Sequence, residues 1–275
     1  LMNSREKYIL QALQQTGSIS LSELSSTLGV SLVTIRKDVA NLEAKELVSR
    51  QHGSVSLPYQ YENNQIPFSL REAFNEQDKK LIAKAAATLI HPDDAIALDS
   101  GTTTYMIANE IKSLPPVNIV TNSIRAAMAL EQSHHTIFLA GGQVLSRSMC
   151  TVGPEAEKIF YQIRPDKVFI GTTGISSDLN LTASLNIEVG VKQAMIQVAR
   201  QVILVTSSQS FHRNRMFIFG SASQIHCIIT THPEPPAEIL EQIAEHNIHL
   251  VYADDPESVK SLENWDKNMG RRNGI

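Results

Sequence analysis

Cysteine is scarce in this sequence of 275 residues, since only Cys150 and Cys227 occur. Two cysteines without metal-ligand spacing argue against a disulfide framework and are typical of a reducing compartment. No apolar run approaches the roughly 18 residues that a membrane span needs, and the N-terminus lacks the apolar stretch of a signal peptide. The histidines show no ligand spacing, so we expect no metal site and no cofactor. These absences predict a cytoplasmic protein without a membrane partner.

An excess of charge of one sign is also missing. The chain has 24 Lys and Arg against 28 Asp and Glu, which gives a net charge of -4, and 42% of its residues are hydrophobic. This balance is ordinary for a soluble globular chain and excludes a uniformly basic protein. Any contact with nucleic acid must therefore come from a local patch. The length favours one large domain or two of ordinary size.

The beginning of the chain shows three short helical patterns separated by turns. The first pattern starts near Ser4 and stops at residues 16–18, and Ser20 with Glu23 forms a capping-box arrangement before the second. A tight turn at Gly29 leads into the third pattern. Three such helices with a glycine turn before the third are typical of a helix-turn-helix. Apolar residues are expected on one stripe of the third helix: Leu32, Ile35, Val39 and Leu42.

In this interpretation the third helix enters the major groove of DNA and is followed by a hairpin-like wing. Short side chains at its start can approach base edges, and basic ones can reach bases or phosphates. The wing is formed by residues 47–50 and 55–57 around a turn at 51–54. We therefore expect DNA contacts from Ser31, Val33, Thr34, Arg36 and Lys37 in the helix and from Arg50 and His52 in the wing.

A protein-docking or dimerisation module is the alternative for this segment, with Arg36 and Lys37 on a merely solvated face. Residues 1–57 hold six Lys and Arg against five Asp and Glu, a net charge of only +1. A DNA-binding module with so little charge binds modestly as a monomer. A DNA-binding function therefore predicts a homo-oligomer, either a dimer or a tetramer.

The rest of the chain divides into three segments. Residues 58–77 mix proline, amide and aromatic residues without a clear period, which indicates a linker. Over 78–255 apolar strands alternate with helical patterns, which indicates an open, mostly parallel α/β sheet. Residues 256–275 look irregular. Strands are expected at 95–98, 117–121, 136–140, 167–170, 202–206, 227–230 and 248–251, with helices near 78–90, 104–112, 124–131, 154–161, 188–199 and 236–245.

Small polar residues and glycines follow four of these strands. Ligands of open α/β sheets gather at the C-terminal ends of the strands. Hydroxyls and unpaired amides at a helix N-terminus suit a phosphate, so the loop after strand 95–98 is the predicted phosphate cradle. Helix capping is the structural alternative for any one such loop. The candidate binding residues are Asp99, Ser100, Gly101, Thr102, Thr103, Thr104, Thr121, Asn122, Ser123, Gly141, Gly142, Gly171, Thr172, Thr173 and Gly174.

Glu188 and Lys192 are four residues apart on one predicted helix, so they share a face. They form either an ordinary surface pair or a ligand contact, in which Lys192 meets a phosphate or carbonyl oxygen and Glu188 a hydroxyl. Asp99 could likewise accept sugar hydroxyls or cap the local turn.

The stretch from Arg5 to Gly53 resembles the N-terminal domain of the DeoR family of bacterial repressors. Three segments match that family's helix-turn-helix signature: Leu24–Ser31, Thr34–Asp38 and Leu42-Glu43. Lys37 stands where the family pattern usually has a second Arg, and Ser54 replaces the second of two wing glycines. The resemblance implies binding to double-stranded operator DNA.

Residues 71–231 are similar to the DeoR-family sensor domain, whose fold is similar to ribose-5-phosphate isomerase. The resemblance implies a non-enzymatic repressor of a carbohydrate-utilisation operon, controlled by a phosphorylated sugar whose phosphate is held at residues 100–103. Glu188 and Lys192 match the family's Glu and Lys. The landmarks are Asp99–Thr104, Thr121–Ser123, Gly141-Gly142, Gly153, Phe169–Gly171 and Gly174-Ile175.

Two segments depart from the family pattern. Asn180–Ala183 replaces Gly-Leu-Thr-Thr, and Thr206–Phe211 replaces Asp-Ser-Ser-Lys-Phe, so an acid and a lysine give way to neutral residues. These changes predict a different ligand or fewer charge-assisted bonds to it. The alternative function is a sugar-phosphate isomerase with an accessory N-terminal domain, for which Glu188 and Asp99 are the candidate bases.

Overall fold

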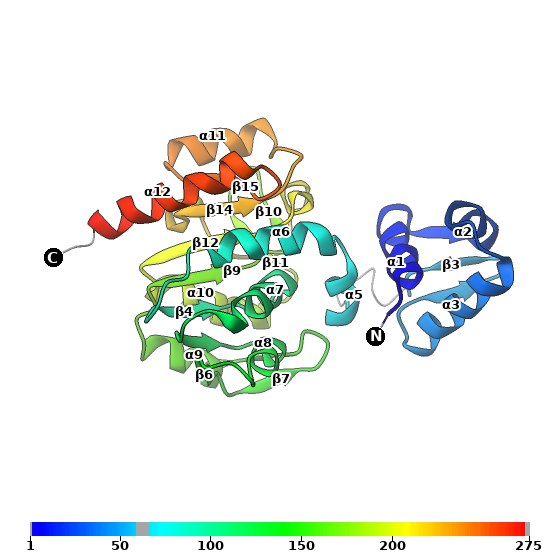
Figure 1. Ribbon diagram of the computed structural model, residues 1–275, viewed down its shortest axis with the longest axis horizontal. Helices are drawn as coiled ribbons and strands as arrows, with labels where there is room; N and C mark the ends of the chain where they lie inside the picture. Colours follow the sequence, from blue (N-terminus) through cyan, green and yellow to red (C-terminus); the bar gives the residue numbers. More distant parts are fainter. Residues whose placement is uncertain (1, 59–65, 273–275) are drawn as a thin grey trace. The chain divides into compact units, whose positions relative to one another are not determined.

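The computed structural model describes residues 2–58 and 66–272 and divides into two compact units, Leu1–Glu76 and Gln77–Ile275 (Figure 1). One buried apolar cluster lies in the first unit and two lie in the second. Among the described residues, no helix has both the length and the apolar character that a membrane span requires.

The first three helices of the first unit and the hairpin after them form as the sequence predicts, and an additional strand at Ser18–Ser20 completes a small antiparallel sheet. The side chain of Ser20 accepts a hydrogen bond from the amide of Glu23 and so starts the second helix. Gly29 ends that helix in the left-handed conformation, with φ of 63°. The elements are α1 (Ser4–Thr16), β1 (Ser18–Ser20), α2 (Leu21–Leu28), α3 (Leu32–Ala44), β2 (Ser49–Gln51) and β3 (Ser54–Ser56), with sheet order β1-β3-β2.

Two details of this unit differ from the sequence-based prediction. Leu32 was expected on the buried stripe of α3 but is 41% exposed, because the first turn of the helix extends beyond the core. The predicted linker over 58–77 is wrong in its second half, where α5 (Phe68–Ala73) forms. Leu70, Ala73 and Phe74 are spaced for one helical face, and they bury that face in the core of the first unit.

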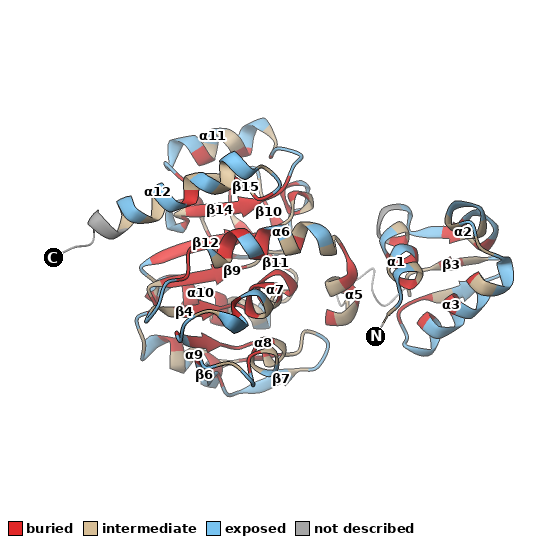
Figure 2. Ribbon diagram, viewed as in Figure 1, coloured by how far each residue is buried: buried red, intermediate tan, exposed pale blue. Residues whose placement is uncertain are grey.

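The second unit has an open seven-stranded parallel sheet, which confirms the predicted fold class. Its strand order is β15-β14-β12-β9-β4-β5-β6. The central strands β9 and β12 are buried along their whole length (Figure 2), which requires cover on both faces. The strands are β4 (Ala95–Leu98), β5 (Asn118–Thr121), β6 (Thr136–Leu139), β9 (Lys167–Ile170), β12 (Gln201–Val205), β14 (Cys227–Thr230) and β15 (His249–Tyr252).

Seven helices of the described chain supply that cover in two layers. The layer of α9, α10 and α11 packs on one face and that of α6, α7, α8 and α12 on the other. Their bounds are α6 (Glu76–Ala87), α7 (Thr102–Glu110), α8 (Ile124–Ala129), α9 (Pro154–Tyr161), α10 (Val189–Val198), α11 (Ala237–Glu245) and α12 (Pro256–Arg272).

The predicted irregular tail over 256–275 is wrong, because Pro256–Arg272 forms α12; residues 273–275 lie outside the described part. Leu262 is fully buried against the sheet, and Val259 and Trp265 pack beside it. The three residues are spaced at i, i+3 and i+6, so one apolar face holds an otherwise polar helix in place. The ring of His249 stacks on Trp265 at 5.7 Å between centroids.

Two small antiparallel sheets, which the sequence did not predict, complete the second unit. The sheet of order β10-β11-β13 consists of β10 (Gly174-Ile175), β11 (Leu181–Ala183) and β13 (Phe217–Gly220). The hairpin of β7 (Gln143–Leu145) and β8 (Cys150–Val152) follows β6. Both contribute residues beside the C-terminal ends of the large sheet's strands.

Candidate functional site

The N-terminal half of α3 presents a row of exposed side chains. Ser31 caps the helix by accepting a hydrogen bond from the amide of Thr34 at 3.2 Å. Val33 is 73% exposed, and Arg36 and Lys37 are also exposed. An exposed apolar side chain between short polar and basic ones suits a groove in which thymine methyl groups and base edges alternate.

The wing lies close enough to α3 for one direct ion pair. Arg50 on β2 contacts Glu43 on α3 at 3.6 Å, and both side chains are more than 40% exposed. His52 is exposed at the tip of the β2–β3 turn, where Gly53 takes a φ of 76°. The structure therefore brings all seven predicted DNA-contact residues to exposed or half-exposed positions on α3 and the wing.

A partly buried ion pair that sequence reasoning missed joins α1 to α3. Arg5 donates two hydrogen bonds to the carboxylate of Asp38, at 2.7 and 3.2 Å, and Asn3 donates a third at 3.2 Å. The Asp38 side chain is only 3% exposed. The hydrogen bond from Arg5 holds the pKa of Asp38 below its usual value, against the opposing effect of burial.

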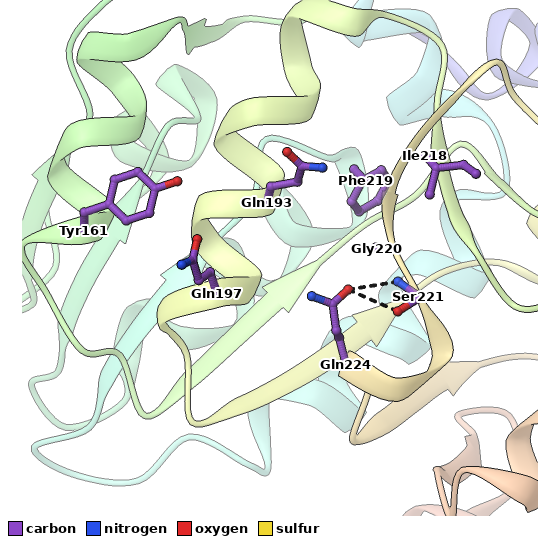
Figure 3. A pocket seen from close by; sticks show the side chains of 8 residues that line it. All are labelled: Tyr161, Gln193, Gln197, Ile218, Phe219, Gly220, Ser221 and Gln224. Atoms are coloured by element: carbon purple, nitrogen blue, oxygen red, sulfur yellow. Dashed lines mark hydrogen bonds between the residues drawn. The ribbon is translucent and has the colours of Figure 1, made fainter.

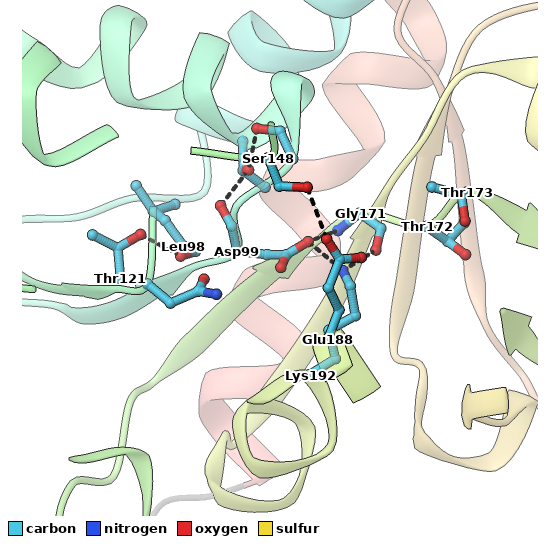
Figure 4. Close-up of polar contacts among 12 residues, drawn as sticks. Leu98, Asp99, Thr121, Ser148, Gly171, Thr172, Thr173, Glu188 and Lys192 are labelled. Carbon is cyan, nitrogen blue, oxygen red and sulfur yellow. Dashed lines mark hydrogen bonds and ion pairs between the residues drawn. The ribbon is translucent and has the colours of Figure 1, made fainter. Parts of the chain in front are cut away.

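In the second unit, the ends of β4 and β9 and the start of α10 meet at a buried ion pair (Figure 4). Asp99 Oδ2 lies 2.6 Å from Lys192 Nζ and accepts a hydrogen bond from the amide of Gly171 at 3.1 Å. Lys192 also donates to the carbonyl of Gly171 at 2.9 Å. The other carboxylate oxygen, Asp99 Oδ1, is buried without a hydrogen-bond partner in the described chain. Buried acceptors in proteins are normally paired, so this oxygen requires a donor from outside the described chain, such as an ordered water or a ligand hydroxyl.

The loop after Asp99 opens α7 without a side-chain cap. Gly101 is the N-cap residue, so no side chain bonds the first amides of the helix. Thr104 is fully buried, and its hydroxyl donates to the carbonyls of Asp99 and Gly101. Thr104 therefore holds the loop in shape, whereas Ser100, Thr102 and Thr103 make no side-chain hydrogen bond within the described residues. This turn offers amides and hydroxyls to an anion.

The predicted residues at the end of β5 mainly use their side chains for hydrogen bonds to the surrounding backbone. Thr121 donates its hydroxyl to the carbonyl of Leu98 at 2.6 Å, and Ser123 caps α8 through the amide of Ala126. Asn122 donates to the carbonyl of Thr151, while its Oδ1 is buried without a hydrogen-bond partner in the described chain. Of these three predicted residues, Asn122 alone keeps an unused buried polar atom.

The glycines after β6 and β9 permit close backbone approach. Gly142 has a φ of 115°, and a Cβ there would lie 2.7 Å from the carbonyl oxygen of Val152. Gly174 is equally confined, because a Cβ would lie 2.5 Å from the carbonyl oxygen of Arg213. Both Gly141 and Gly142 are exposed at the end of β6.

Thr172 and Thr173 tie the end of β9 to the β10–β11 sheet. Thr172 donates to the carbonyls of Gly174 and Thr182, at 2.7 and 2.9 Å. Thr173 donates to the same Thr182 carbonyl at 3.2 Å. Their hydroxyl protons are thus engaged, although both residues are half-exposed next to Gly171.

Glu188 precedes α10 in a short 3-10 helix, Asn186–Glu188, and is half-exposed. Its Oε1 accepts a hydrogen bond from Ser148 at 3.0 Å (Figure 4). Ser148 lies in the β7–β8 turn and was missed by sequence reasoning, because nothing in its local pattern indicates that contact. Glu188 therefore links this turn to the helix that carries Lys192.

A separate pocket of about 450 Å³ is lined by the end of α9, by α10 and by β13 with the turn after it (Figure 3). Phe219 lines it and also lies under Lys192, with 4.9 Å between Nζ and the ring centroid. The pocket contains none of the predicted site residues. Its lining is Tyr161, Gln193, Gln197, Ile218, Phe219, Gly220, Ser221 and Gln224.

Comparison with known families matches both units. The DeoR-like helix-turn-helix domain matches residues 5–60, and the DeoR C terminal sensor domain matches residues 74–232, more than half of the chain. The chain belongs to the DeoR family. It is a transcriptional regulator with a DNA-binding helix-turn-helix module and a sensor domain.

Curated relatives match almost end to end. The glycerol-3-phosphate regulon repressor of Escherichia coli K12 is 32% identical over 90% of this chain and 97% of its own length. The putative aga operon transcriptional repressor of Escherichia coli O157:H7 is 30% identical over 90% and 93%. Among solved structures, ribose 5-phosphate isomerase A from Methanocaldococcus jannaschii covers 50% of this chain and 54% of its own, at 17% identity and a TM-score of 0.38.

Proposed function

We propose that this DeoR-family regulator represses a carbohydrate-utilisation operon and releases its operator when a phosphorylated sugar binds beside Asp99 and Lys192. The phosphate binds the first turn of α7, at Ser100–Thr103, where the amides have no side-chain cap. The observation that carries the proposal is the unpaired Asp99 Oδ1. It is buried on a carboxylate that pairs with Lys192 and that directly precedes this turn in the sequence. A sugar hydroxyl supplies the donor that this oxygen lacks.

The names of two relatives support repression as the effect on transcription. Two relatives that match over nine-tenths of the chain are repressors of a glycerol-3-phosphate regulon and, putatively, of the aga operon. DNA contacts come from Ser31, Val33, Thr34, Arg36 and Lys37 on α3 and from Arg50 and His52 on the wing. Since the first 57 residues carry a net charge of only +1, two copies in a homo-oligomer supply the affinity that one lacks. A regulator of this kind acts in the cytoplasm.

The ligand controls DNA binding only if it binds two states of the protein with different affinity. Asp99, Gly171 and Lys192 join three elements at one point, so a ligand there can change how β4, β9 and α10 are held together. The bound state is the one with lower operator affinity.

The test starts with an operator selected from a random-sequence duplex library on the purified full-length protein. Fluorescence anisotropy then measures operator affinity with and without glycerol 3-phosphate, ribose 5-phosphate, fructose 6-phosphate and glucose 6-phosphate, each against its unphosphorylated form. We expect one phosphorylated compound to weaken operator binding at least tenfold. The proposal is wrong if no duplex is selected, or if saturating concentrations of every compound leave operator affinity unchanged.

An isomerase function has less support from the geometry. Asp99, one candidate base, is held in an ion pair with Lys192, and Glu188, the other, accepts a hydrogen bond from Ser148. We infer that these groups bind and do not transfer protons. Aldose–ketose conversion of ribose 5-phosphate by the pure protein, abolished in Glu188→Gln, would contradict this inference.

A further inference from the structure

Two arginines occupy the segment between the 3-10 helix Ser208–His212 and β13. The backbone of this segment is fixed on the small sheet: the carbonyl of Arg213 accepts a hydrogen bond from the amide of Ile175 at 2.7 Å. The amide of Arg215 donates to the hydroxyl of Thr182 at 3.0 Å. Only a glycine fits opposite, since a Cβ on Gly174 would collide with the Arg213 carbonyl.

This segment adjoins the Asp99–Lys192 site through a short series of contacts. Thr182, which binds the amide of Arg215, accepts a hydrogen bond from Thr172 through its carbonyl. Thr172 directly follows Gly171, whose carbonyl accepts from Lys192. The two arginines thus come from the part of the small sheet that borders the end of β9.

Neither guanidinium has an acidic partner among the described residues. Arg213 donates one long hydrogen bond, 3.4 Å, to the side-chain oxygen of Gln209. The Nε of Arg215 is buried without a hydrogen-bond partner in the same described chain. Arg213 is exposed at the surface and Arg215 half-exposed. Partial desolvation, and then the nearby charge of Arg215, lower the pKa of Arg213. Two neighbouring cations without a counter-charge repel each other, and an anion bound between them would relieve that repulsion.

We propose that Arg213 and Arg215 form a second anion subsite of the effector site, so that the effector carries two acidic groups. Its phosphate binds Ser100–Thr103, and a second phosphate or a carboxylate binds the arginine pair. Guanidinium groups bind both acids through paired hydrogen bonds, so either can occupy the subsite. This inference rests on the proposed function and narrows it to bisphosphorylated sugars and phosphorylated sugar acids.

The departure of Thr206–Phe211 from the family pattern agrees with this assignment. An acid and a lysine of the usual pattern are replaced there by neutral residues, so that segment supplies no charge of its own. Arg213 and Arg215, which follow this segment after His212, are the positive charges closest to it in the sequence. A ligand with an additional acidic group fits that difference.

Isothermal titration calorimetry of the full-length protein with three matched pairs of compounds tests the inference. The pairs are glycerol 3-phosphate and 3-phosphoglycerate, glucose 6-phosphate and 6-phosphogluconate, and fructose 6-phosphate and fructose 1,6-bisphosphate. In at least one pair we expect the compound with two acidic groups to bind ten- to a hundredfold more tightly. The double variant Arg213→Gln/Arg215→Gln should lose this preference and keep its affinity for the monophosphate. Arg164→Gln, an exposed arginine before β9, is the control and should behave as the wild type.

The outcomes separate the two proposals. Equal affinity within each pair, or a preference that persists in the double variant, overturns the second subsite and leaves the proposed function standing. Failure of all six compounds to bind overturns the inference together with the phosphorylated-sugar part of the proposed function. Preference for the acids identifies a carboxylate in the subsite, and preference for the bisphosphate identifies a phosphate.

Discussion

Lys192 Nζ and Asp99 Oδ2 lie 2.6 Å apart although 93 residues separate them in the sequence. The pair forms where the end of β4 meets α10, and the Asp99 side chain is 1% exposed and that of Lys192 10%. Water screens such a pair poorly, so each charge depends on the other. Removing one charge alone therefore also destabilises the fold, and a double variant is needed to separate the structural role of the pair from its role in ligand binding.

Lys192→Met should lower the free energy of unfolding by about 3 kcal/mol, because it leaves the Asp99 carboxylate buried and unpaired. Asp99→Asn/Lys192→Met removes both charges and should recover much of that loss. Thermal melting with chemical denaturation checks the order of stability. When operator DNA is saturated with either variant, adding the sugar phosphate should no longer release the DNA. A double variant that still responds to the sugar phosphate would show that the pair serves stability alone.

Thr102 and Thr104 offer a matched comparison within one turn of α7. Thr104→Val removes a hydroxyl whose single proton is shared between the carbonyls of Asp99 and Gly101, so stability should fall by about 1–2 kcal/mol. Thr102→Val removes a hydroxyl with no hydrogen bond in the described structure, so stability should hardly change. Effector affinity should instead fall roughly tenfold, since a phosphate loses one charge-assisted bond. Calorimetric titration and melting of both variants check this. The reverse pattern would place the phosphate elsewhere.

Arg36→Ala should weaken operator binding by roughly ten- to a hundredfold, because the variant lacks an exposed guanidinium on the surface of α3 that is predicted to contact DNA. A phosphate contact would also lower the slope of log affinity against log salt by about one. Anisotropy titrations at several salt concentrations measure both quantities. Lys112→Ala, an exposed lysine of the sensor unit, is the control and should change neither. Wild-type affinity in Arg36→Ala would remove α3 from the predicted interface.

The large sheet could be predicted because its strands are short, continuous apolar runs. The first and last residues of β4, β9 and β14 agree with the sequence-based prediction. Strands that are buried on both faces are nearly continuous apolar runs, so their ends are visible in the sequence. The candidate site followed from the same pattern, because polar residues at the ends of parallel strands meet at one edge.

Other features depend on contacts between distant residues and left no local signal. The β10-β11-β13 sheet pairs residues up to 39 positions apart in the sequence, the most distant pair being Leu181 and Gly220. The apolar face of α12 is narrow and the rest of the helix is polar. The composition of this segment therefore indicated an irregular tail. The contact between Ser148 and Glu188 and the hydrogen bond from Arg215 to Thr182 likewise could be seen only in the folded chain.

Asp38→Asn should destabilise the first unit at neutral pH but not in acid. The pKa of Asp38 is lowered in the folded state by Arg5, so the ion pair stabilises the fold above about pH 4 and loses its effect as pH falls through the lowered pKa. Opening of α1 and α3 should be about tenfold more frequent in the variant at pH 7. Hydrogen exchange measured by mass spectrometry on peptides from these helices reports the difference, corrected for the intrinsic rate at each pH. The gap should shrink as pH falls below about 4, the ordinary pKa of an aspartate, and close once pH has passed the lowered pKa of Asp38 in the folded wild type. Glu23→Gln, which changes an exposed carboxylate in the same unit, should show no such gap. A constant difference between Asp38→Asn and wild type down to low pH would mean that packing, and not the charge of Asp38, holds α1 against α3.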